Sequence, residues 1–183
     1  LNGHVDLGTG IATALAQIVA EELDAPLSQV RMVLGDTARA PNQGATIASA
    51  SIQIHAAPLR QAAAQARGGL TERAAETLGV QPSLLRARDG RVETEDGTHG
   101  VGFGALVAER RDVLLLAPQV ALKHPQDYRI VGTSQARVDI PAKLSGAMVF
   151  VHDMRLPGML HGRVVRPPYA GAGHGRFIGK TLE

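Results

Sequence analysis

The sequence predicts an α+β fold of two parts, with strands and two long helices at residues 1–125 and a β-rich second unit at residues 126–183. Apolar residues recur at helical spacing from Ile11 to Leu23. An alanine-rich stretch from about Ser49 to Leu78 predicts a second, longer helix. After residue 126, short apolar segments alternate with glycine and proline, a pattern typical of strands and turns.

Composition limits the class of protein. A chain of 183 residues can bury one core, or a core and a smaller second unit. No apolar run approaches the roughly eighteen residues of a membrane helix. The absence of cysteine excludes disulfides, thiolate zinc sites, cysteine nucleophiles and directly bound iron–sulfur clusters within these residues. A net charge of +2, with two tyrosines, three phenylalanines and no tryptophan, argues against a nucleic acid partner.

The first elements are a strand, a glycine turn and a helix. Alternating polar and apolar residues up to Leu7 predict a strand that ends in the tight turn Gly8-Thr9-Gly10. The helix then runs from Ile11 to Leu23. Within it, Glu21 and Glu22 are expected on the solvated face.

A second strand, a polar loop and the long helix follow. Alternation at residues 30–34 predicts the strand, and residues 36–46 have the turn chemistry of an ordered loop. The long helix is expected to close at Gly79. Pro58 either kinks this helix or marks its first turn.

The middle of the chain is expected to hold a hairpin at Asp89-Gly90, one or two helical turns at residues 103–108 and a strand at residues 114–122. Residues 100–104 resemble a phosphate loop in composition, but no clear strand precedes them and no long helix follows. We interpret them as a flexible connection. Residues 124–127 are expected to form a linker.

Four extended segments are predicted in the second unit, at residues 130–131, 138–140, 148–151 and 160–165. The chain starts at Leu1 without a methionine and stops without a closing element, so truncation at both ends is expected.

The first candidate site is the glycine turn. Backbone N–H groups of Gly8, Thr9 and Gly10, with the Thr13 hydroxyl, would lie at a helix N-terminus, which favours an anion. Spacing alone favours a plain turn over such a site. The dinucleotide fingerprint and the P-loop are both incomplete.

The second candidate site is the polar loop, which offers hydrogen-bonding groups to a ligand across from the glycine turn. An alternative is that Asp36 and Thr37 only satisfy local backbone groups. The candidates in this loop are Asp36, Thr37, Asn42, Gln43 and Thr46.

The histidines show none of the close spacings that metal sites use, and His152 and His161 are interpreted as structural. No nucleophile is framed by a base, and no glutamate stands out as a catalytic acid or base. The seven histidines are His4, His55, His99, His124, His152, His161 and His174.

Two long motifs carry a family resemblance. Residues 3–23, Gly-His-Val-Asp-Leu-Gly-Thr-Gly-Ile-Ala-Thr followed by Gln-Ile-Val-Ala-Glu-Glu-Leu, resemble the pterin-binding segment of molybdenum hydroxylases, and residues 35–49 resemble the same family's Asp-Thr and Pro-x-x-Gly-x-Thr-x-x-Ser loop. Residues 131–146 and 151–168 resemble the start of the a/b hammerhead domain of those subunits. Residues 80–125 match least.

The chain is therefore similar to the large, molybdopterin-binding subunits of the xanthine dehydrogenase/aldehyde oxidase family. The pterin segment precedes the hammerhead here, an order similar to the nicotinate dehydrogenase and isoquinoline 1-oxidoreductase type. The resemblance implies a molybdenum-cofactor-binding domain at residues 1–125, a hammerhead from residue 126, and molybdopterin with molybdenum in its cytosine dinucleotide form. The cofactor contacts it implies are Gly8, Thr9, Gly10, Thr13, Asp36, Thr37 and Thr46.

The resemblance also implies an activity and partners. The reaction would be hydroxylation of an N-heteroaromatic compound beside its ring nitrogen, or oxidation of an aldehyde, with water as the oxygen source. Electrons would leave through a [2Fe–2S] small subunit towards a c-type cytochrome, in the bacterial cytoplasm or at the inner membrane or periplasm. The family's catalytic glutamate falls beyond Glu183, so this fragment is expected to be inactive alone.

One departure from the family motif supports an alternative. Thr9 stands where the wider family has glutamine, and threonine reaches less far. A non-catalytic interaction module that kept the fold and lost the cofactor is therefore a second hypothesis. A stand-alone phosphate-binding protein is a third.

Overall fold

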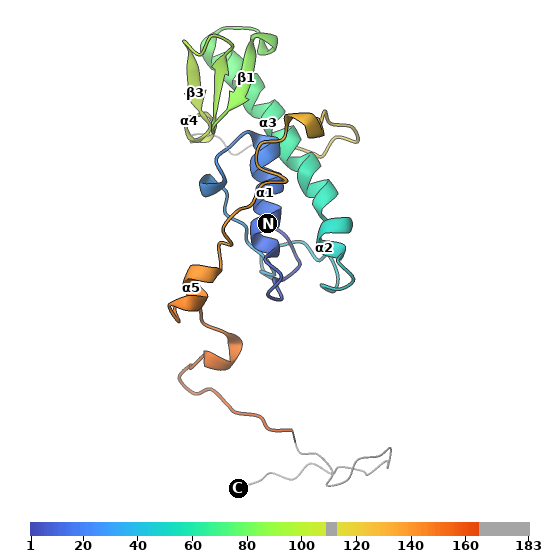
Figure 1. Ribbon diagram of the computed structural model, residues 1–183, viewed down its shortest axis with the longest axis vertical. Coiled ribbons are helices and arrows are strands. Elements are labelled where there is room, and N and C mark those ends of the chain that lie inside the picture. Colours follow the sequence, from blue (N-terminus) through green and yellow to red (C-terminus); the bar gives the residue numbers. More distant parts are fainter. Residues whose placement is uncertain (109–112, 165–183) are drawn as a thin grey trace.

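The computed structural model describes residues 1–108 and 113–164 as an α+β arrangement, in agreement with the predicted fold class (Figure 1). Its helices are α1 (Ile11–Leu23), α2 (Ala50–Gln53), α3 (Ala56–Leu78), α4 (Phe103–Val107) and α5 (Ile140–Leu144). Its strands are β1 (Leu85–Arg88), β2 (Arg91–Thr94) and β3 (Gly100–Gly102). Single 3-10 turns lie at Leu27–Gln29, Pro82–Leu84, Pro125–Asp127 and Val151–Asp153.

Helices α1 and α3 lie side by side and form the centre of the molecule (Figure 1). Ile11 and Leu15 of α1 are buried against Ala56 of α3 in the first of two small cores. Both long helices are confirmed. Pro58 lies in the first turn of α3, as one of its two interpretations predicts, and Gly79 ends the helix with a φ of 69°.

The sheet is antiparallel in the order β1-β2-β3 and packs on the C-terminal half of α3. The hairpin at Asp89-Gly90 is confirmed, with φ values of 50° and 79° at these two residues. The core of this part is Val92, which is fully buried against Ala74 of α3 and Leu106 of α4. Two buried clusters therefore hold the two ends of α3.

Residues 100–104 are not a flexible connection, as predicted, but strand β3 followed by the start of α4. Val101 pairs directly with Val92 of β2 and packs on the second core. The prediction failed because Val101 pairs with a residue of another strand, Val92, and the local sequence pattern does not reveal this partner.

The two strands predicted before the long helix are reduced to one parallel bridge between Asn2 and Leu34. At the point where the first strand would continue, the Val5 N–H donates to the Thr46 side chain at 3.0 Å instead of to a neighbouring strand. Without a run of backbone partners, alternating residues do not make a strand.

The strand predicted at residues 114–122 is also wrong. This segment is irregular, and side chains of α3 hold it in place of a strand partner. Gln65 donates to the Leu115 carbonyl and accepts from the Ala117 N–H, while Arg67 donates to the Ala121 carbonyl. The segment is thereby attached along one side of α3.

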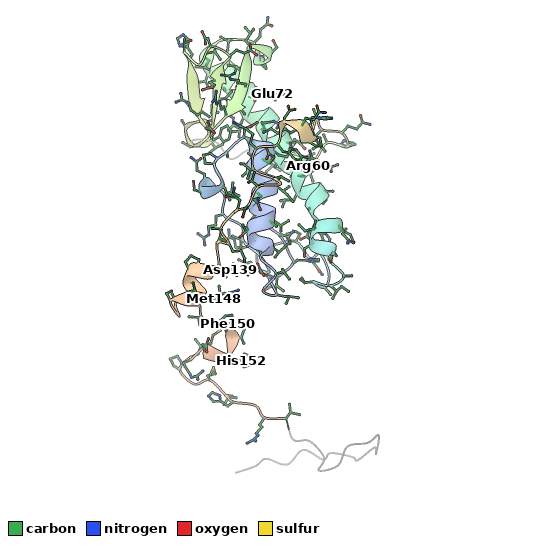
Figure 2. The ribbon with its side chains drawn as sticks, in the orientation of Figure 1. Arg60, Glu72, Asp139, Met148, Phe150 and His152 are labelled. Atoms are coloured by element: carbon green, nitrogen blue, oxygen red, sulfur yellow. The ribbon has the colours of Figure 1, made fainter. Side chains whose placement is uncertain are left out.

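The extended segments predicted after residue 126 do not form strands in the part of the second unit that the structure describes, residues 126–164. Ile140 begins helix α5, and beyond it the chain extends away from the helices, carrying Met148, Phe150 and His152 (Figure 2). Side chains there are exposed, Leu160 by 94%, so no burial offsets the cost of ordering a strand. Val165, His174 and the end of the hammerhead motif lie outside the described residues.

No helix in the described ranges is long and apolar enough to cross a membrane.

Candidate functional site

The glycine turn before α1 is organised by the carboxylate of Asp6. Oδ1 accepts from the Gly8 N–H at 2.8 Å and the Gly10 N–H at 3.3 Å, and Oδ2 accepts from the Ala12 N–H at 3.3 Å. The expected anion at this helix N-terminus is therefore a side chain of the protein itself. Burial opposes ionisation of Asp6, but the three N–H donors outweigh it and lower its pKa.

The turn is braced from the second unit. Arg137 donates to the Gly8 carbonyl at 3.1 Å and forms an ion pair with Asp139 at 2.7 Å. The Thr13 hydroxyl, which is 4% exposed, accepts from the Val138 N–H at 3.0 Å. Thr13, which was predicted as a cofactor contact, thus holds residues 137–139 against α1.

The polar loop is attached to the N-terminal segment by Gln43. Its Oε1 accepts from the Gly3 N–H at 2.6 Å, and its Nε2 forms a hydrogen bond with His55 Nδ1 at 3.1 Å. Its backbone carbonyl oxygen forms a hydrogen bond with His4 Nε2 at 3.2 Å. A Cβ on Gly3 would overlap the Pro41 carbonyl oxygen, so only glycine permits this approach. These contacts bring the two predicted site segments together.

A hollow of about 370 Å³ lies between the glycine turn and the end of the polar loop. Thr9 and Thr46, both predicted as site residues, share its wall. The Thr46 hydroxyl accepts from Val5, so its own hydrogen can be donated to a ligand. The wall consists of Leu7, Thr9, Ile11, Ala14, Thr46, Ile47, Ala48, Ser49, Ser51 and Ile52.

Two residues of this wall have strained backbones. Ala48 and Ser49 adopt left-handed conformations, with φ values of 48° and 57°. Such a conformation costs a residue other than glycine about 1–2 kcal/mol, and strain of this kind clusters at ligand sites. The strained pair therefore marks the hollow, among the surfaces described, as a candidate binding site.

Asp36 and Asn42, also predicted as site residues, form hydrogen bonds within the polar loop itself. Asp36 accepts from the Ala38 N–H at 3.0 Å and forms an exposed ion pair with Arg39 at 3.8 Å. Asn42 accepts from the Gly44 N–H at 3.0 Å. Asp36 and Thr37 lie outside the wall of the hollow.

The prediction that Glu21 and Glu22 are solvated is wrong, since they are only 2% and 1% exposed. Glu22 forms ion pairs with Arg60 at 2.6 Å and Arg67 at 3.5 Å. Lys123 donates its ammonium to Glu21 at 3.1 Å and its backbone N–H to Glu22. Cations from two distant segments compensate the burial of these carboxylates, so the helical pattern alone could not reveal it.

Sequence reasoning also missed Asp6, His4 and Ser51. Asp6 stands two residues before a glycine, the arrangement in which an aspartate binds the backbone N–H two residues ahead, and that signal could have identified it. His4 is 1% exposed and its Nδ1 lies 2.7 Å from Ser51 Oγ. No local pattern indicates that pair.

Histidines form no metal cluster with acidic residues in the described ranges. His152 and His161, interpreted as structural, are both exposed there.

Comparison with known proteins gives a consistent set of relatives. Residues 1–143 match the family of molybdopterin cofactor-binding domains. The chain is 59% identical over 181 residues to one of the subunits of nicotinate dehydrogenase from Pseudomonas putida, a match that covers 99% of the chain and 15% of that protein. It is 32% identical over 170 residues to a membrane-bound pyrroloquinoline-quinone aldehyde dehydrogenase of Gluconacetobacter polyoxogenes, covering 90% and 22%.

A third relative is the beta chain of isoquinoline 1-oxidoreductase from Brevundimonas diminuta, with 31% identity over 207 residues, covering 91% of the chain and 26% of that protein. The chain spans between 15% and 26% of the length of these three relatives.

Proposed function

The chain belongs to the family of molybdopterin cofactor-binding domains, and from this premise we propose that the hollow between the glycine turn and the polar loop is its part of the cofactor site. The observation that carries the proposal is the juxtaposition of Thr9 and Thr46 in one wall, next to the strained pair Ala48 and Ser49. The sequence resemblance to the nicotinate dehydrogenase and isoquinoline 1-oxidoreductase type, made on the order of the pterin segment and the hammerhead motif, is confirmed by the relatives.

The chemistry of the hollow fits one edge of a pterin. A flat heterocycle with polar edges needs apolar walls and a few hydrogen-bonding groups, and small-ligand sites have volumes of about 300–1,000 Å³. Leu7, Ile11 and Ile52 supply apolar surface, while Thr9 and Thr46 supply hydroxyl groups. A hollow of about 370 Å³ accommodates a ring of this kind.

The glycine turn does not fit a phosphate in the same way. Its N–H groups at Gly8 and Gly10 already donate to Asp6, and a phosphate there would face that carboxylate. We assign to Gly8 and Gly10 the role of shaping the turn that presents Thr9. We assign no direct cofactor contact to Thr13, Asp36 or Thr37.

When bound, the molybdenum cofactor supplies the redox chemistry. The residues of this chain hold one edge of the pterin through the hydroxyls of Thr9 and Thr46 and exclude water from it with the apolar wall. We propose no catalytic residue within the chain, so the isolated 183-residue chain is inactive.

We propose that the complete protein is a molybdenum hydroxylase subunit that oxidises a nicotinate-like N-heteroaromatic compound or an aldehyde, with water as the oxygen source. The names of the relatives, a nicotinate dehydrogenase, an isoquinoline oxidoreductase and an aldehyde dehydrogenase, support this substrate range. Two of those names denote subunits, which supports an assembly with partners. We propose a [2Fe–2S] subunit and a c-type cytochrome as the partners, and the cytosine dinucleotide form of the cofactor.

We also propose that residues 126–183 begin a hammerhead domain. The support for the hammerhead assignment is the motif at residues 131–146. The chain extends away from the packed helices only after α5 (Figure 1). Residues 128–138 nevertheless contact α1, so the two units share an interface.

The test is a metal and pterin analysis of the complete protein, co-expressed with its neighbouring iron–sulfur subunit. We expect molybdenum and a pterin in equal amounts, close to one of each per subunit. An intact, folded complex without molybdenum would contradict the proposal and favour a non-catalytic interaction module.

A further inference from the structure

A chain of hydrogen bonds behind the hollow has its directions fixed by backbone groups. The Gly3 N–H can only donate, so Gln43 Oε1, 2.6 Å away, is the acceptor. The amide nitrogen of Gln43 therefore faces His55 and donates to its Nδ1 at 3.1 Å. This assignment leaves no freedom to exchange the amide oxygen and nitrogen.

The same reasoning fixes which ring nitrogen of a neutral His4 carries the hydrogen. Its Nε2 lies 3.2 Å from the Gln43 carbonyl oxygen, which can only accept, so Nε2 carries the hydrogen. The other nitrogen, Nδ1, is then an acceptor. Since it lies 2.7 Å from Ser51 Oγ, the Ser51 hydroxyl must donate its single hydrogen to His4.

Burial holds this arrangement in place. His4 is 1% exposed, its backbone N–H donates to Asn2 at 3.0 Å, and its ring meets the ring of His55 edge to face at 4.4 Å between centroids. In the described part of the chain, Ser51 Oγ forms no second hydrogen bond. The oxygen of Ser51 therefore retains lone pairs and has no hydrogen to give.

Ser51 is part of the wall of the hollow, so a ligand that reaches its hydroxyl meets an acceptor. We propose that Ser51 selects a ligand group with an N–H donor, and that His4 is the positioning residue that sets this preference. The inference rests on the proposed function, because it assigns an orientation to the pterin: the exocyclic amino group faces Ser51, and an oxygen edge does not.

The preference follows from the cost of a mismatch. An oxygen of a carbonyl or an ionised phosphate placed against Ser51 would face lone pairs and lose its hydrogen bond to water without replacement. A pterin and its analogue lumazine distinguish these cases, because lumazine carries a carbonyl oxygen in place of the amino group of pterin.

The experiment is a fluorescence titration of the complete protein with pterin and with lumazine. The protein is produced with its partner subunit in a host that makes no molybdenum cofactor, so that the hollow can accept the probes. The variants are Ser51→Ala, His4→Phe and His4→Asn, the last retaining an oxygen that can accept from Ser51. Circular dichroism reports whether each variant folds.

We expect the wild type to bind pterin about tenfold more tightly than lumazine, which is the effect of one satisfied hydrogen bond. Ser51→Ala and His4→Phe should reduce this ratio to about one, and His4→Asn should restore most of it. If His4→Phe does not fold, Ser51→Ala decides. A wild type that binds pterin but keeps the same ratio in Ser51→Ala overturns this inference alone. A wild type that binds neither probe contradicts the proposed function itself.

Discussion

Glu21 of α1 binds the backbone of Ile130, with Oε2 accepting the Ile130 N–H at 2.6 Å. The same oxygen accepts from the N–H groups of Arg129 and Val131, both at 2.9 Å, so one buried carboxylate holds three consecutive residues of the second unit. We expect Glu21→Gln to lower the free energy of unfolding by about 3 kcal/mol, because the charge that these donors and Lys123 surround is lost. Urea denaturation measures the loss.

The matched control is Glu72→Gln on the exposed surface of α3 (Figure 2). We expect it to change the free energy of unfolding by less than about 0.5 kcal/mol. Equal effects of the two substitutions would show that Glu21 is not a specific anchor.

Protonation at acidic pH should weaken the contacts that Glu21 and Asp6 make with backbone N–H groups. Burial raises the pKa of Glu21, but the N–H donors of residues 129–131 and Lys123 outweigh it, so the pKa lies below its ordinary 4.5; that of Asp6 lies below 3.8. A lowered folded-state pKa stabilises the fold above the ordinary value, and this contribution is lost as the pH falls through the folded-state pKa.

We therefore expect the free energy of unfolding to be flat from pH 7 to about pH 5 with respect to these two groups and to fall below about pH 4.5. Glu21→Gln should show a shallower fall, measured by urea denaturation at a series of pH values. Identical slopes in the wild type and in Glu21→Gln would contradict the assignment.

Gly3→Ala should separate the polar loop from the N-terminal segment. The new Cβ would overlap the Pro41 carbonyl oxygen, and backbone cannot move aside as a side chain can. We expect a loss of about 2 kcal/mol or more in the free energy of unfolding. We also expect faster amide hydrogen exchange at position 3 and in residues 41–46, measured by NMR or mass spectrometry. Unchanged exchange in this loop would contradict the predicted displacement.

Gly68→Ala, in contrast, should raise the free energy of unfolding. Gly68 lies in the interior of α3, and nothing lies within 4 Å of the position that its Cβ would take. Alanine restricts the unfolded chain and favours the helix, so we expect a gain of about 1 kcal/mol in the free energy of unfolding. A loss, measured by thermal or urea denaturation, would show that α3 is not continuous through this glycine.

The elements that could be predicted from the sequence carry their signal locally. Helical periodicity marks α1, and Asp89-Gly90 marks its hairpin, because these patterns depend on near neighbours. The strands predicted at residues 30–34 and 114–122 failed because a strand needs a partner. At residues 114–122 the partners are side chains of α3.

The residues of the candidate site also divide into those that local sequence motifs predict and those that depend on distant contacts. Thr9 and Thr46 were predicted from their motifs, and the structure brings them into one wall. The buried carboxylate of Glu21 was missed because its donors stand more than one hundred residues later. Ser51 was missed because its partner, His4, is 47 residues away. Long-range contacts of this kind leave no trace in local spacing.

The most direct test of the central claim is to fill the hollow. Ala14 is part of its wall, and Ala14→Phe would place an aromatic ring in the space that we assign to the pterin. The control is Ala105→Phe, at an exposed alanine of α4 outside the hollow. Both variants are made in the complete protein with its partner subunit, and molybdenum and pterin are measured per folded subunit.

We expect the wild type and Ala105→Phe to contain the same amounts of molybdenum and pterin, and a folded Ala14→Phe to lose at least about nine-tenths of both, because an obstructed pocket cannot close around its ligand. A folded Ala14→Phe variant with the full content of molybdenum and pterin would contradict the claim that this hollow holds the cofactor.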